Sequence, residues 1–158
     1  MYRILLLGLI VIVASSCRKN LDNLSINQAE QRIHGKWTMT EVKNNVRNDG
    51  KWSKNDVTTH YRNWEFDFKA DRTLTVYIPD EDATLVGSWE IYEDWETDAD
   101  GETDLNTFLY IYMYDVSNTN NWRELVWENM RVSSDVFKAR EESFIEGERV
   151  FYFYEMRR

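Results

Sequence analysis

The sequence predicts an all-β fold, an eight-stranded antiparallel up-and-down barrel preceded by a short helix. Apolar and polar residues alternate in eight segments, turn residues separate these segments, and aromatic residues make up 15% of the chain. Alternation with a period of two indicates strands with one buried face, and so many aromatics are typical of a packed core. Closure into a barrel removes exposed strand edges, and a flattened β-sandwich is the alternative.

The helix is expected from Ser25 to Ile33. Ser25 and Gln28 have the spacing of a capping box, which marks a helix N-terminus. Gly35 follows the expected end, where a left-handed residue often stops a helix.

The clearest strands form a hairpin. Trp64 to Lys69 alternates aromatic and charged residues, residues 70–72 form a short turn, and Thr73 to Ile78 alternates again. Such a pattern predicts one inward face for both strands, which carries Trp64, Phe66, Phe68, Leu74, Val76 and Ile78.

The other strands follow from the same alternation, with Gly, Asn, Asp and Ser turns between them. They are expected at Lys36 to Lys43, Thr84 to Tyr92, Leu105 to Tyr114, Trp122 to Arg131, Val136 to Glu141 and Arg149 to Met156. One long connection, Asn44 to Arg62, is predicted after the first strand.

The first residues predict an exported lipoprotein. Arg3 precedes an uncharged apolar run, residues 4–14, which is too short to span a bilayer and matches a secretory signal. Small residues then lead to Cys17, the single cysteine, so it has no disulfide partner in the chain. Residues 13–17 resemble a bacterial lipobox, which implies a signal peptide over 1–16, palmitate or a similar acyl chain on Cys17, a tether over 17–24 and a barrel domain over 25–158.

The location follows from that resemblance. Acyl chains on Cys17 would anchor the protein to a membrane. Arg18 stands where an inner-membrane retention signal would have Asp. We therefore expect the cell envelope, at the outer membrane facing the periplasm.

The layout also resembles a known family. Gly35-Lys36-Trp37 opens the first strand after a short helix, as the Gly-x-Trp motif does in lipocalins. The chain is most similar to lipocalin-like lipoproteins of Bacteroidetes-type bacteria. In that family the tryptophan packs at the closed end of the barrel under an arginine, which here is Arg157 or Arg158. The family's middle motif is missing.

Charge and residue content exclude several functions. The formal net charge of −9 becomes one unit more negative when Arg3 is removed, so nucleic acid is not an expected partner. The two histidines, His34 and His60, are far apart in sequence, which gives no sign of a zinc site or catalytic centre. We expect neither an enzyme nor a cofactor.

The acidic segment around residue 100 is a weak calcium candidate. Glu96, Asp98 and Asp100 alternate before Gly101, with Asp104 nearby, and alternating carboxylates can converge on a hard cation. The residues after the loop read as a strand, whereas a calcium loop of this kind precedes a helix. A solvated acidic hairpin loop is the simpler interpretation.

Two strands are apolar on both faces, Leu105 to Tyr114 and residues 150–154. Their aromatics either fill the barrel or line a cavity for a small hydrophobic or amphiphilic ligand. For a cavity, the candidate wall residues are Phe66, Val76, Trp89, Tyr112, Trp127 and Tyr152. For a filled barrel, the exposed aromatic faces near Tyr110 and Tyr114 would instead dock an envelope protein.

Overall fold

The computed structural model describes residues 19–20, 24–48, 50–97 and 100–158. In chain order its elements are β1 (Lys19–Asn20), α1 (Ile26–Ile33), β2 (Gly35–Asn48), β3 (Lys51–Asp56), η2 (Thr58–His60), β4 (Glu65–Phe68), β5 (Thr73–Ile78), η3 (Pro79–Glu81), β6 (Ala83–Thr97), β7 (Thr103–Asp115), β8 (Trp122–Val132), β9 (Val136–Ile145) and β10 (Glu148–Arg157).

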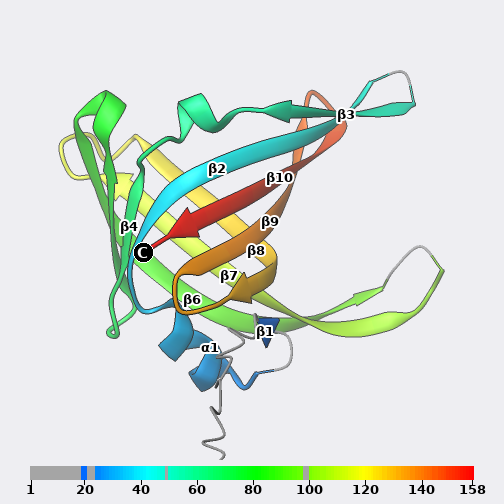
Figure 1. Cartoon of the computed structure of the whole chain (residues 1–158), viewed down its shortest axis with the longest axis horizontal. Coiled ribbons are helices and arrows are strands. Elements are labelled where there is room, and N and C mark those ends of the chain that lie inside the picture. The colour runs from blue at the N-terminus through cyan, green and yellow to red at the C-terminus, as the bar shows by residue number, and fades with distance from the viewer. Residues whose placement is uncertain (1–18, 21–23, 49, 98–99) are drawn as a thin grey trace, which may run out of the picture.

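The strands form one antiparallel sheet that closes on itself. Their order is β1-β8-β7-β6-β5-β4-β2-β10-β9, with β3 paired beside β2. Because β8 also pairs with β9, the sheet becomes a ring, and α1 lies across one end of it (Figure 1). The predicted all-β up-and-down barrel is confirmed.

The eight predicted strands are all present, and several are longer than predicted. The prediction of a connection from Asn44 to Arg62 is wrong for most of its length. There β2 continues to Asn48, the chain returns as β3 in a hairpin, and η2 follows. Every residue of β3 is exposed, so this strand has no alternation of apolar and polar residues that would reveal it.

The helix begins where the capping box predicts. The backbone N–H of Ser25 donates to the side-chain oxygen of Gln28 at 3.4 Å. Ala29 and Ile33 form the buried stripe of α1, and this stripe faces the barrel end.

Trp37 closes that end of the barrel. It is fully buried, and its Nε1 donates to the carbonyl of Ile33 at 2.7 Å. The guanidinium of Arg158 lies 4.1 Å from the centre of the Trp37 ring and also donates to the carbonyls of Arg32 and His34. Arg157 instead pairs with Glu155. Of the two candidate arginines, Arg158 is the one that covers Trp37.

Large aromatic side chains fill the half of the barrel above α1. Phe137 contacts Trp37 at 5.6 Å and Trp127 at 5.7 Å between ring centres, and Phe68 meets Trp89 edge-on at 5.6 Å. His34 packs against Trp89 from the α1 end.

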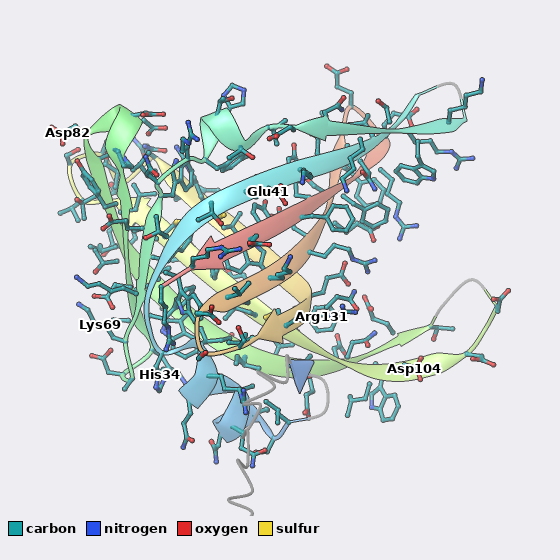
Figure 2. All side chains as sticks on the ribbon, in the orientation of Figure 1. His34, Glu41, Lys69, Asp82, Asp104 and Arg131 are labelled. Carbon is teal, nitrogen blue, oxygen red and sulfur yellow. The ribbon has the colours of Figure 1, made fainter. Side chains whose placement is uncertain are left out.

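The β6–β7 hairpin, which carries Asp104, projects far to one side (Figure 2).

Candidate functional site

A cavity of about 230 Å³ occupies the other half of the barrel, and no residue of α1 lines it. Its wall combines six aromatic residues, three other apolar residues and three polar ones. They are Tyr61, Trp64, Phe66, Trp127, Tyr152 and Tyr154; Met39, Met113 and Leu125; and Arg123, Glu141 and Ser143.

Strand alternation places most of this wall. Every second residue of β8 from Arg123 to Trp127 points inward, and Tyr152 and Tyr154 do the same on β10. Glu141 on β9 is the register partner of Tyr152. Trp127 is fully buried and contacts Phe66 at 5.6 Å, so it forms the floor that separates the cavity from the packed half.

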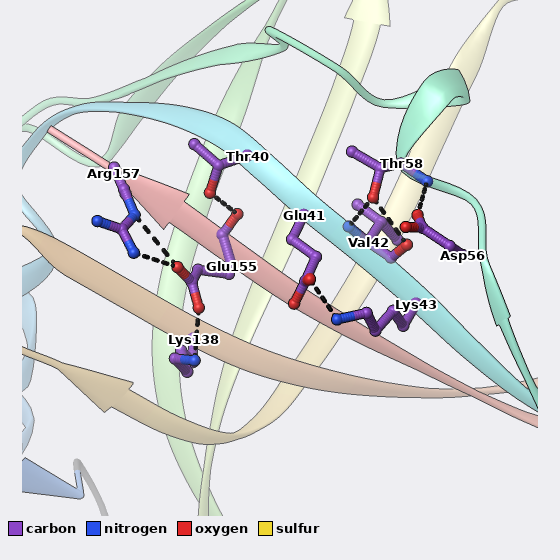
Figure 3. A network of polar contacts seen from close by, with 9 residues as sticks. All are labelled: Thr40, Glu41, Val42, Lys43, Asp56, Thr58, Lys138, Glu155 and Arg157. Atoms are coloured by element: carbon purple, nitrogen blue, oxygen red, sulfur yellow. Dashed lines mark hydrogen bonds and ion pairs between the residues drawn. The ribbon is translucent and has the colours of Figure 1, made fainter.

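The segment after β3 forms part of the roof. The Thr58 hydroxyl accepts from the backbone N–H of Val42 at 3.0 Å and lies 3.2 Å from the Val42 carbonyl, and the N–H of Thr58 donates to Asp56 (Figure 3). Hydrogen bonds from the Thr58 side chain and backbone N–H hold the pKa of Asp56 below its usual value. The bonds between Thr58 and Val42 tie η2 to β2 and so fix the start of the segment that carries Tyr61.

Tyr61 and Trp64 complete the roof. Their rings lie 5.3 Å apart, and the Tyr61 ring is also 6.3 Å from that of Tyr154. The Trp64 carbonyl accepts from the N–H of Met39 at 2.8 Å. Burial raises the pKa of Tyr61, as expected for a hydroxyl held among apolar groups.

Glu141 brings a carboxylate into this aromatic wall. It accepts a hydrogen bond of 2.6 Å from the Tyr154 hydroxyl. Burial raises the pKa of Glu141, and the Tyr154 hydroxyl and the nearby Trp127 indole partly offset that effect. The Trp127 Nε1 itself is buried without a hydrogen bond of normal geometry. Burial and the Glu141 charge together raise the pKa of Tyr154.

Arg123 is the cationic residue of the lining, and it already has partners. Its guanidinium lies 5.1 Å from the centre of the Trp64 ring and 3.3 Å from the carboxylate of Glu81 in η3. Both side chains are partly exposed, so this pair lies at the mouth of the cavity.

The structure brings together half of the candidate wall residues. Phe66, Trp127 and Tyr152 line the cavity. Val76 and Trp89 are buried but do not line it. Tyr112 is half-buried outside the barrel, where its ring lies 6.5 Å from that of Trp122.

The sequence did not show which face of β7 points inward. The inward positions are Leu109, Ile111 and Met113, all buried, but the tyrosines between them are hydrophobic too, so Tyr112 could not be placed from alternation. Glu141 was not predicted, although it continues the inward phase of Phe137 and Ala139. The signal that could have identified Glu141 was a charged residue at a position that alternation predicts to be buried.

The metal and catalytic alternatives gain no geometric support. Glu96 and Asp104 face each other across the β6–β7 hairpin, and Glu96 accepts from Asn106 at 2.8 Å. Asp98 lies outside the described residues, among which no cluster of three or more His, Cys, Asp or Glu side chains is arranged to hold a metal ion. His34 is at the α1 end and His60 is in η2, so they do not share a site.

The outer face of β7 and β8 carries a second aromatic group. Tyr112 contacts Tyr114 at 6.1 Å, and Trp122 is 55% exposed. Tyr110 donates to Glu124 at 2.7 Å, and this bond raises the pKa of Tyr110 to about 12.

Cys17 and the predicted signal peptide lie outside the described residues. Within residues 19–20, 24–48, 50–97 and 100–158, no helix has the length and apolarity needed to cross a bilayer. No protein-family model, curated protein or solved structure matches the chain.

Proposed function

We propose that this protein is a membrane-anchored, lipocalin-like binding protein that holds a small hydrophobic or amphiphilic molecule in the barrel cavity. The observation that carries the proposal is the cavity itself, because aromatic side chains fill one half of the barrel and leave about 230 Å³ free in the other. Concave, mostly apolar sites with a few polar groups are the usual form of a small-molecule site.

The volume limits the size of the ligand. An engineered apolar cavity of about 150 Å³ binds benzene. A cavity of about 230 Å³ therefore has room for one aromatic ring with a short chain. A long-chain lipid would have to leave most of its length outside.

The tether would leave the mouth of the cavity free. β1 pairs with the end of β8, with Asn20 opposite Arg131, and that end of β8 lies near α1. An acyl anchor at Cys17 would therefore hold the closed end toward the membrane and turn the mouth toward the periplasm. Labelling of cells with a palmitate analogue, compared with Cys17→Ser, tests the anchor.

Neighbouring substitutions on β8 test the cavity. Leu125→Trp places its bulk in the cavity, whereas Val126→Trp places the same bulk on the outer face. In calorimetric titrations of the full chain in maltoside micelles, a neutral probe such as 2-phenylethanol should bind the parent chain and Val126→Trp but not Leu125→Trp. Equal behaviour of the two variants, or failure of the parent chain to bind this probe and its charged analogues of similar size, refutes the proposal.

The outer face of β7 and β8 supports a second candidate function, docking of an envelope protein. Trp122 and Val126 are exposed there beside the tyrosine cluster, and exposed apolar patches often mark interaction surfaces. Cross-linking in cells should then capture one dominant partner that is lost in Tyr110→Ser or Tyr114→Ser.

A further inference from the structure

The carboxylate of Glu141 has no cationic partner in the cavity. No ion pair joins it to a lysine, arginine or histidine of the described residues, and no positive charge is among the causes that set its pKa. Arg123, the cation of the lining, is engaged by Glu81 and by the Trp64 ring. A partly buried carboxylate without a compensating positive charge is costly.

The surroundings of Glu141 nevertheless prepare it to carry a charge. The Tyr154 hydroxyl donates to it at 2.6 Å, and both this bond and the Trp127 indole favour the ionised form. Burial favours the neutral form. The balance lacks one contribution, a positive charge in contact with the Glu141 carboxylate.

The aromatic walls can supply the rest of a cation site. The faces of Trp and Tyr rings carry negative electrostatic potential and attract cations. Trp127 and Tyr154 lie 5.1 Å apart beside Glu141, and Tyr61 contacts Tyr154 from the roof. The Arg123 guanidinium over Trp64 shows that this wall already holds one cation on a ring face.

We propose that the cavity takes a small organic cation, a protonated amine on one aromatic ring or a similarly small apolar body, with the ammonium group at Glu141. This inference rests on the proposed function and names its ligand class. The apolar body would contact Phe66, Met113 and Leu125. The net charge of −9 adds attraction at long range for a cation and repels an anion.

Three probes of nearly equal size test the sign of the charge. They are 2-phenylethylamine as cation, 2-phenylethanol as neutral analogue and 3-phenylpropionate as anion, titrated by calorimetry into the full chain in maltoside micelles at pH 8. We expect the amine to bind at least about tenfold more tightly than the alcohol, the range for a hydrogen bond to a charged group. The anion should bind most weakly.

Two adjacent substitutions locate the charge. Glu141→Gln keeps the shape of the side chain but removes its charge, so amine affinity should fall about tenfold or more while alcohol affinity stays within about twofold. Glu142→Gln is the matched control, because Glu142 pairs with Arg149 on the outer face. It should leave all three affinities unchanged.

A pH series on the parent chain gives a test without mutation. Because burial raises the pKa of Glu141, amine binding should weaken as the pH is lowered from 8 toward and through that pKa. The amine keeps its own charge throughout, as an alkylammonium titrates near 10. Alcohol binding should not change. Burial raises the pKa of Tyr61 and of Tyr154, so both hydroxyls stay neutral over this range. The other ionisable side chains that face the site are Tyr152 and Arg123.

The outcomes separate the inference from the function on which it rests. Equal affinities for amine and alcohol, or amine binding that survives Glu141→Gln, would overturn the cation assignment and leave the binding function standing. Failure of all three probes to bind the parent chain would overturn both. If the anion bound most tightly, the cation assignment would be overturned and Arg123, not Glu141, would be the residue that binds the charged group of the ligand.

Discussion

The contact between Arg158 and Trp37 should stabilise the closed end of the barrel by a measurable amount. Arg158→Ala removes a guanidinium 4.1 Å from the ring centre and its bonds to the carbonyls of Arg32 and His34. A cation over an indole contributes about 0.5–2 kcal/mol. Because Arg158 is exposed, solvent screens the two hydrogen bonds. We expect a total loss of about 1–2 kcal/mol in unfolding free energy.

The neighbouring arginine is the control. Arg157 is also exposed and pairs with Glu155, which keeps Lys138 as a second partner. Arg157→Ala should therefore cost less than about 0.5 kcal/mol, as surface ion pairs do. Urea unfolding followed by tryptophan fluorescence measures both variants, and thermal unfolding should show a loss of about 3–8 °C for Arg158→Ala alone.

A double-mutant cycle assigns the energy to the contact. Trp37→Leu removes the ring together with the Nε1 bond to Ile33 and should cost about 3–5 kcal/mol. In the Trp37→Leu background, Arg158→Ala should cost about 0.5–1.5 kcal/mol less than in the parent chain. Additive losses, or equal losses for the two arginine variants, would refute the argument that Arg158 acts through Trp37.

Three other substitutions give independent tests. Gly87→Ala should prevent folding or cost more than about 3 kcal/mol, because an added Cβ would lie 1.8 Å from the Tyr112 carbonyl oxygen. Ser88→Ala, on the outer face, is the control and should change the unfolding free energy by less than about 0.5 kcal/mol. Protein yield and urea unfolding measure both variants. Glu141→Gln should stabilise the chain near pH 8 and flatten its pH dependence in urea unfolding. The raised pKa of Glu141 makes the folded state hold a proton that the unfolded state has lost, so unfolding free energy falls as pH rises above 4.5, the ordinary value, through the folded pKa. Glu124→Gln should bring the Tyr110 pKa from about 12 toward 10, measured by NMR of tyrosine labelled at Cζ, and an unchanged value would exclude the Glu124 bond as its cause.

The sequence predicted the barrel because its signals are local. A strand with one buried face must alternate, and a helix start must satisfy its free N–H groups, so Phe66 to Ile78 and the Ser25 cap are visible in the residues themselves. β3 was missed because both of its faces are exposed, and it is held by hydrogen bonding to β2 and by the contact of Trp52 with Phe151. Only pairing between segments reveals such a strand.

The cavity depends on how side chains from distant strands fill shared space, which alternation does not report. Aromatic content predicted that the barrel was either filled or hollow, and the structure has both states, one in each half. The difference lies in packing: Trp37, Phe68, Trp89 and Phe137 interlock above α1, whereas on the other side of Trp127 the facing positions carry Ser143, Met113 and Leu125 with Glu141. A carboxylate at an inward position of a barrel strand costs stability, and a ligand charge that offsets this cost would explain why the position is not apolar.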